Sequence, residues 1–180
     1  MASILASTFC IVDYGVALMN DCKYGYDVHG NTLSLSLIKC ATDPNKNADK
    51  GRHVFVYALY PHKGGLRESK TVQLSYVLNN QLKAIKTNGK NGEKSLSFAS
   101  LDKENVILET IKGSEIGDGV ILRLYEGLGL ETEINVYVEN ASKVYLCDMM
   151  EKEERELPVE NGVIKLTLKP YEIVTVKCKR

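Results

Sequence analysis

Between residues 95 and 177 the sequence is a succession of short apolar or alternating segments separated by turn residues, and this spacing leaves few folds open. Asp118-Gly119 and Asn161-Gly162 are turn signals, and the second is typical of a β-hairpin. Short strands at such intervals predict a small antiparallel β-sandwich. The expected strands are Ser95–Phe98, Asn105–Lys112, Val120–Glu126, Glu133–Glu139, Val144–Cys147, Val163–Lys169 and Ile173–Lys177.

The first half of the chain also has strand-like patterns. Residues Thr32–Lys39 alternate between apolar and polar, which predicts a half-buried strand. His53–Tyr60 is apolar on both faces and predicts an interior strand of a sandwich, opened by a structural histidine. Val72–Leu78 alternates again and predicts a further strand. Because no segment keeps a helical period over three turns, the predicted fold class is all-β, built from antiparallel β-sandwiches.

Between Asn79 and Ser95 the apolar pattern fades. This stretch contains the turn signals Asn88-Gly89 and Asn91-Gly92. We therefore predict two domains, residues 1–90 and residues 91–180. The mixed-charge run Glu151–Glu156 is expected to be a solvated loop.

The composition argues against several classes of partner. Lys plus Arg (23) equals Asp plus Glu (23), so the formal net charge is zero. A general nucleic-acid binder would need a basic face, and an anionic membrane surface would also select basic residues. No apolar run approaches the ~20 residues that span a bilayer. We expect neither a nucleic-acid nor a membrane partner.

Five scattered cysteines form no C-x-x-C pair, and the three histidines lack the spacing of a metal site. Reduced, mostly buried thiols in a cytoplasmic protein are therefore expected. The spacing predicts no metal ligand within this chain.

The stretch Asn20–Gly30 has the densest group of chemically active side chains, and its first eight residues are expected to form a loop. Its candidate substrate-binding residues are Asp21, Tyr24, Tyr26 and Asp27. A tyrosine ring offers a sugar both an apolar face and a hydroxyl group. Three alternatives stay open: the two aspartates could be a catalytic carboxylate pair, Asp21 could cap a turn, and the tyrosines could be ordinary structural residues.

The segment Tyr14–Asp27 closely resembles a signature in the C-terminal region of glycoside hydrolase family 38 α-mannosidases. The likeness covers the chain from about Asp13 to its end. Its first motif is long and specific, whereas the later ones are short. The later motifs are Gly30–Leu33, Asp43-Pro44, Ala48-Asp49, Gly51, His53–His62, Leu122–Glu126 and Pro170–Ile173.

The resemblance implies a fold and a division of labour. The first domain should be the end of a galactose-mutarotase-like supersandwich, and the second a small terminal β-sandwich. The parent would be a retaining, zinc-dependent exo-α-mannosidase acting on α-mannosides and oligomannose glycans. Its zinc ligands and nucleophile would lie in an N-terminal catalytic domain outside this chain, which this chain supports and to which it contributes a pocket-lining loop. By itself the chain is expected to be inactive.

Two alternative functions and one possible partner, a second copy of the chain, are also expected. The chain could be a free-standing carbohydrate-binding module, although it has no tryptophan for a stacking platform. It could also be a purely structural interaction domain. Because a partial sandwich leaves strand edges unpaired, we predict a homo-oligomer through the edges of the first half.

Overall fold

The computed structural model describes residues 6–11, 13–86 and 95–180. The chain divides into two compact units, Met1–Lys86 and Thr87–Arg180. Every sheet in the described residues is antiparallel. The prediction of an all-β fold made of antiparallel sandwiches is confirmed, with one short helix among the residues that the structure describes. The turn signals Asn88-Gly89 and Asn91-Gly92 lie outside the described residues.

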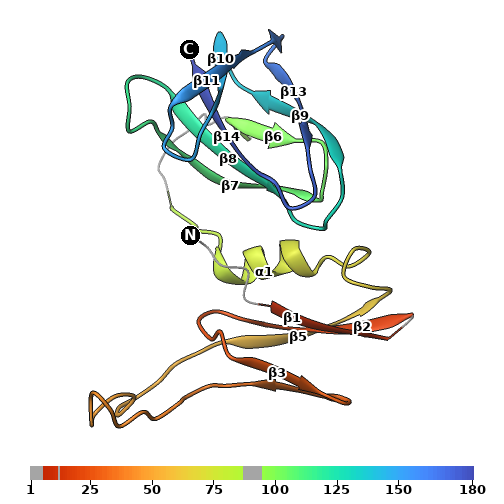
Figure 1. The fold of residues 1–180 in the computed structure, drawn as a ribbon, viewed down its shortest axis with the longest axis vertical. Coiled ribbons are helices and arrows are strands. Elements are labelled where there is room, and N and C mark those ends of the chain that lie inside the picture. Colours follow the sequence, from red (N-terminus) through yellow and green to blue (C-terminus); the bar gives the residue numbers. More distant parts are fainter. Residues whose placement is uncertain (1–5, 12, 87–94) are drawn as a thin grey trace. The chain divides into compact units, whose positions relative to one another are not determined.

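The second unit is a sandwich of two sheets (Figure 1). One sheet has the order β11-β10-β14-β8-β7 and the other β12-β13-β9-β6. The strands are β6 (Ala99–Leu101), β7 (Val106–Gly113), β8 (Val120–Glu126), β9 (Thr132–Val138), β10 (Lys143–Cys147), β11 (Glu153–Leu157), β12 (Val159–Glu160), β13 (Val163–Leu168) and β14 (Ile173–Lys179). Branched residues from both sheets form one core, with Leu122, Leu124, Val136, Ile164 and Val176 fully buried.

The hairpin predicted at Asn161-Gly162 is present and joins β12 to β13. Both residues have positive φ, 53° and 75°, as a two-residue hairpin turn requires. A Cβ at Gly162 would lie only 2.8 Å from the carbonyl oxygen of Val138, so the turn also needs glycine for space.

Two predictions in this unit were wrong. The strand expected at Ser95–Phe98 lies a few residues later, as β6. The charged run expected to be a loop forms most of β11, an edge strand that pairs only with β10 among the described strands. Its charged side chains are exposed and only Leu157 is buried. An edge strand tolerates such charges, which also discourage pairing with other chains.

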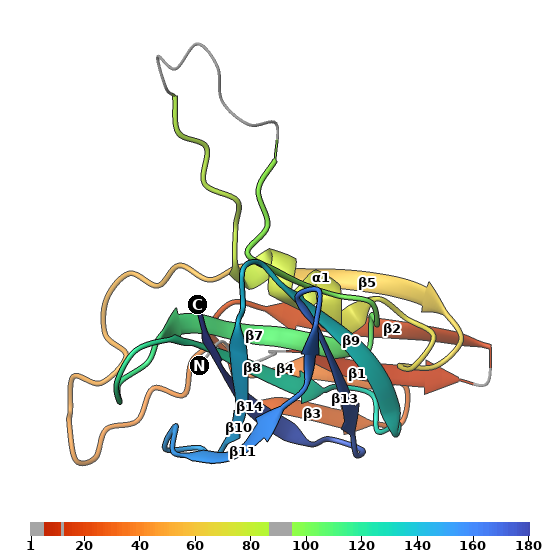
Figure 2. The ribbon, with the colours of Figure 1, turned by 90° about the horizontal axis from the view of Figure 1, so that it is seen from above.

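The first unit has three layers (Figure 1 and Figure 2). Its central sheet has the order β1-β2-β5, from β1 (Ala6–Ile11), β2 (Tyr14–Asn20) and β5 (Tyr57–Lys63). The helix α1 (Thr71–Asn79) lies on one side and contacts β2 and β1. The hairpin of β3 (Tyr26–His29) and β4 (Thr32–Leu35) lies on the other side.

The helix α1 replaces the strand predicted at Val72–Leu78, and that prediction was wrong. Alternating apolar residues fit a strand, but the buried residues include Thr71, Val72 and Ser75. Polar side chains bond the helix backbone one turn back: the Ser75 hydroxyl donates to the Thr71 carbonyl at 2.8 Å, and Asn79 Nδ2 donates to the Ser75 carbonyl at 3.0 Å. A partly polar buried face hid the helical period.

The interior strand predicted at His53–Tyr60 was also misplaced. β5 begins at Tyr57 and pairs only with β2 among the described strands, so it is an edge strand. Its apolar residues remain open, with Leu59 66% exposed, and the preceding Val54 is 74% exposed. His53 is exposed too, and its Nε2 lies 2.8 Å from the Asp49 carbonyl oxygen. The second apolar face of β5 is therefore left uncovered within this unit.

In the part of the chain that the structure describes, no helix is long and apolar enough to cross a membrane.

Candidate functional site

The candidate residues lie where β2 passes into β3. β2 ends at Asn20 and β3 begins at Tyr26, so the connecting loop is shorter than the sequence predicted. Asp21 and Tyr24 lie on this loop, whereas Tyr26 and Asp27 belong to a strand.

Asn20 organises the loop. Its side chain is almost completely buried. Its Oδ1 accepts hydrogen bonds from the backbone N–H groups of Cys22, at 3.0 Å, and of Lys23, while its Nδ2 donates to the Tyr26 hydroxyl. The Asn20 carbonyl oxygen accepts from Asn79 Nδ2 at 3.3 Å. One buried residue thus ties together the start of the loop and its exit strand through its side chain, and helix α1 through its backbone carbonyl.

The turn-capping role weighed for Asp21 belongs to Asn20. An asparagine that bonds the backbone two and three residues ahead forms an Asx turn, and the Asn-Asp pair after an apolar strand was the signal for it. The Asp21 backbone N–H instead donates to the Val56 carbonyl oxygen at 3.1 Å. A hydrogen bond from the Cys22 thiol lowers the pKa of the exposed Asp21 carboxylate, and the same bond raises the pKa of that thiol.

Tyr26 and Asp27 point to opposite sides of the β3–β4 hairpin. Tyr26 lies opposite Leu35, and Asp27 lies opposite Ser34. Because successive strand residues face opposite ways, the two side chains cannot line the same surface of the hairpin. Tyr26 is half-buried, and burial raises its pKa although the hydrogen bond with Asn20 acts in the other direction. Asp27 is exposed.

Tyr24 is exposed, with 72% of its surface accessible. Its neighbours are held by close packing. The Gly25 carbonyl oxygen accepts from the Ser36 backbone N–H at 2.7 Å, and a Cβ at Gly25 would lie 2.9 Å from the Ser36 Cβ. The Lys23 ammonium lies 5.3 Å from the centre of the Phe55 ring, a cation–π contact that sequence reasoning missed. The loop therefore presents Tyr24 from a well-anchored base.

In the described ranges, no three His, Cys, Asp or Glu side chains gather closely enough to hold a metal ion. The four described cysteines are free: Cys147 and Cys178 are buried, but Cys22 and Cys40 are exposed. The expectation of mostly buried thiols holds for two of these four.

A second polar centre, in the sandwich unit, explains two motifs that the sequence left without a role. The Glu126 carboxylate is buried and accepts backbone N–H groups from Leu128, Gly129, Leu130 and Tyr171 at 2.7–3.1 Å, with a 3.0 Å bond from Asn105 Nδ2. Burial raises the pKa of this carboxyl, but the hydrogen bonds outweigh burial and the net shift is downward. Leu122–Glu126 and Pro170–Ile173 are thus joined by a structural anchor.

Comparison with known proteins agrees with this architecture. Residues 105–176 match the glycosyl hydrolases family 38 C-terminal beta sandwich domain, and residues 6–47 match the glycosyl hydrolases family 38 C-terminal domain. The second match begins before Asp13, where the resemblance was expected to start. A solved family 38 glycosyl hydrolase structure from Enterococcus faecalis covers 99% of this chain with a TM-score of 0.77, at 16% identity and over 22% of its own length.

Curated relatives are similar over most of the chain. Alpha-mannosidase 2C1 from Mus musculus is 37% identical over 167 residues, which are 89% of this chain and 16% of the relative. Alpha-mannosidase from Saccharomyces cerevisiae is 34% identical over 190 residues, 91% of this chain and 17% of the relative. This chain thus spans only about a sixth of their length. It belongs to glycoside hydrolase family 38, as part of the C-terminal β-sandwich region.

Proposed function

We propose that this chain is a supporting part of an α-mannosidase that acts on α-mannosides, including oligomannose glycans. The observation that carries the proposal is the similarity over about nine-tenths of the chain to proteins named alpha-mannosidase. In this proposal the parent is a retaining, zinc-dependent enzyme whose zinc ligands and nucleophile lie in a catalytic domain outside these 180 residues. The residues of this chain then bind or position the substrate and support the catalytic domain.

Within that enzyme, the loop after β2 lines or braces the mannose pocket. Tyr24, Asp21 and Asp27 are exposed and could contact a sugar or the catalytic domain. Tyr26 has a different role, since its hydroxyl is already bonded to Asn20. We assign Tyr26 to positioning the loop. Contacts remote from the reacting bond can raise the rate by holding a substrate in a productive geometry.

The first test is activity of the 180-residue chain by itself. Purified chain should not hydrolyse an aryl α-mannoside, with or without added zinc, because in this proposal the zinc ligands and the nucleophile lie in the catalytic domain outside it. Mannosidase activity that co-purifies with the folded chain, and disappears when the chain is depleted from the sample, would contradict the proposal.

The second test uses a full-length enzyme that carries this chain. Tyr24→Ala and Asp27→Ala should lower kcat/KM by about tenfold or more while the Tm is unchanged, because both side chains are exposed. Tyr26→Phe should lower both, since it removes a bond that holds the loop. His29→Ala, exposed on the same hairpin, is the matched control and should change neither. Unchanged kcat/KM in both exposed variants would show that the loop does not line the pocket.

We also propose that the protein works in the cytoplasm. Cys22 and Cys40 are exposed free thiols. Such thiols persist most readily in a reducing compartment. Fractionation of cells that express the full-length protein tests this, and recovery in a secretory compartment would contradict it.

Finally, we propose that the isolated chain self-associates through its first unit, whereas in the parent these surfaces contact the enzyme's other domains. β1 and β5 are the two edges of the three-stranded sheet in the described residues, and Tyr57 and Leu59 are largely exposed on β5. Unpaired apolar edges are templates for pairing. Light scattering should show a dimer that Leu59→Lys weakens, and a monomer at every concentration would refute this.

A further inference from the structure

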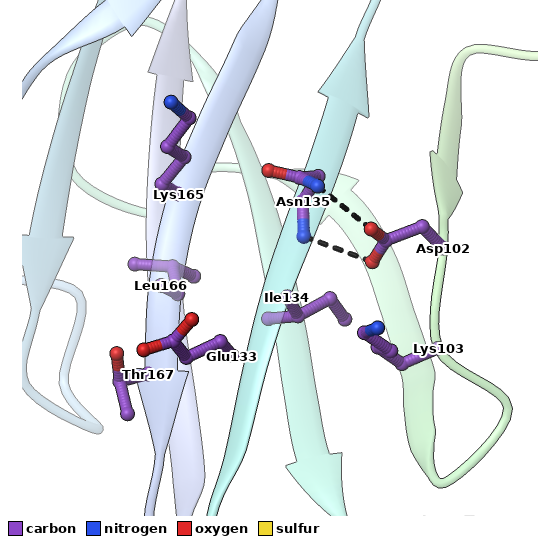
Figure 3. Close-up of a pocket in the computed structure, with 8 residues that line it drawn as sticks. All are labelled: Asp102, Lys103, Glu133, Ile134, Asn135, Lys165, Leu166 and Thr167. Carbon is purple, nitrogen blue, oxygen red and sulfur yellow. Dashed lines mark hydrogen bonds between the residues drawn. The ribbon is translucent and has the colours of Figure 1, made fainter.

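A polar groove crosses the outer face of the sandwich unit, far along the sequence from the loop after β2 (Figure 3). It has a volume of about 500 Å³. This is within the range of small-molecule sites, roughly 300–1,000 Å³, but its polar lining sets it apart from the mostly apolar pockets in that range. The polar residues that line it are Asp102, Lys103, Glu133, Asn135, Lys165 and Thr167.

The register of β9 and β13 explains why these side chains meet. Asn135 lies opposite Lys165, and Glu133 lies opposite Thr167. Since residues two apart share one face of a sheet, all four lie on the outward face. The intervening Ile134 is 2% exposed and belongs to the core. The groove is therefore built on the rigid backbone of the sandwich.

Asp102 is held in place at one wall of the groove. Its Oδ1 accepts the Asn135 backbone N–H at 2.9 Å, and its Oδ2 accepts Asn135 Nδ2 at 2.7 Å. The hydrogen bond from the Asn135 backbone N–H makes the largest contribution to the lowered pKa of the Asp102 carboxyl. The carboxylate is therefore an acceptor near neutral pH. Because Nδ2 is turned toward Asp102, the Asn135 amide oxygen points the other way, toward the Lys165 side (Figure 3).

The charges that line the groove cancel: Asp102 and Glu133 against Lys103 and Lys165. A site for a phosphate or a metal ion would show a surplus of one sign. Within the part of the chain that the structure describes, the side chains of Glu133, Lys165 and Thr167 make no hydrogen bond or ion pair. The groove thus offers uncommitted donors and acceptors without net charge, which suits a ligand covered with hydroxyl groups.

An aromatic ring stands next to this polar set. Tyr137 follows Asn135 by two residues, about 7 Å along the same face of β9. It is 44% exposed and lies between Ser100 and Val163 in the sheet. An exposed tyrosine can cover the apolar C–H face of a sugar ring while polar neighbours bond its hydroxyls.

From this juxtaposition we propose that the β9–β13 groove is a binding site for a neutral saccharide. Asp102, Glu133 and the Asn135 amide oxygen accept from sugar hydroxyls, Lys165 and Thr167 donate to them, and Tyr137 covers the adjoining ring. The site lies in the second unit and does not depend on the catalytic role proposed for the parent.

The test is an NMR titration of the full 180-residue chain, isotopically labelled, with α-mannobiose, α-mannotriose and maltotriose in turn. We expect saturable shifts of backbone signals in residues 102–103, 133–137 and 165–167. A neutral polar peptide of similar length serves as the comparison. Absence of local shifts with every saccharide up to tens of millimolar, or shifts with the peptide alone, would overturn the proposal.

Three variants in the groove identify the site. Lys165→Ala and Thr167→Val change exposed positions, so the fold should persist, and each should weaken binding about five- to tenfold through one lost hydrogen bond. Tyr137→Ala should weaken it at least as much. Lys152→Ala, an exposed lysine outside the groove, is the matched control for charge. Equal affinity in the groove variants and the control would also overturn the proposal.

Discussion

The two units of this chain differ in how completely they bury their own apolar residues. The second unit closes two sheets over one core, in which Leu122, Leu124 and Ile164 have no exposed surface. The first unit has one three-stranded sheet, and it leaves Tyr57 and Leu59 more than half exposed on β5. Its described buried apolar residues are few: Ala17, Leu18, Met19 and Val72.

The difference teaches that the units depend on their surroundings to different degrees. Apolar burial contributes roughly 25 cal/mol per Å² to folding, so a closed core can stabilise the second unit without help. For the first unit we propose that part of its stability comes from a second copy or from the rest of a larger protein. Four changes test this contrast.

The largest effect is expected from Leu122→Ala in the closed core. The variant should lose about 3–5 kcal/mol of the second unit's free energy of unfolding, because a fully buried leucine leaves a cavity. Val77→Ala, at an exposed position of α1 in the first unit and outside the proposed pairing edge, should cost less than about 0.5 kcal/mol. Urea unfolding followed by NMR signals from each unit measures both. Similar losses would abolish the contrast.

Glu126→Gln should be the next most harmful change, at about 2–3 kcal/mol. The carboxylate accepts five hydrogen bonds, and a glutamine would turn an NH₂ donor toward backbone donors. The same unfolding experiment applies, with Glu133→Gln on the exposed face of β9 as the control. Unchanged stability would mean that the backbone N–H groups of residues 128–130 form hydrogen bonds with other acceptors.

In the first unit, Asn20→Ala should cost about 1–2 kcal/mol and loosen the loop after β2. The substitution removes the acceptor for two backbone N–H groups and the partner of the Tyr26 hydroxyl. Hydrogen exchange of the Cys22 and Lys23 amides should accelerate, while amides of β14 stay protected. Unchanged exchange would show that packing alone holds the loop.

The smallest effect is a pH dependence of the second unit. Hydrogen bonds lower the folded-state pKa of Glu126 below its ordinary value of 4.5, even though burial acts against them. A hydrogen bond from the Lys112 side chain likewise lowers the pKa of Glu151. A lowered folded pKa stabilises the fold above pH 4.5, and this stability is lost as the pH falls through the folded pKa. Acid should therefore destabilise this unit, with a shallower slope in Glu126→Gln; an identical slope would contradict it.

How far the sequence predicts the structure follows the same division. β8 was predicted with its observed ends, and β9, β10, β13 and β14 within one or two residues, because short apolar or alternating segments bounded by turn residues mark the strands of a closed sandwich. In the first unit α1 was missed, since Thr71 and Ser75 place polar groups on its buried side. The candidate stretch was identified by composition, but Asn20 was not identified as its organiser, because the Asn-Asp pair signals a turn and does not show that the Asn20 side chain is buried and bonded to Tyr26.

The sequence by itself determined the fold class, most strand positions of the sandwich and the family, since short-range patterning and a long motif are properties of adjacent residues. Only the tertiary structure decided that Tyr26 and Asp27 face opposite ways, that Glu126 joins two distant motifs and that β5 is an edge. Each of these depends on which strands pair and on what covers them, and those are relations between residues far apart in the chain.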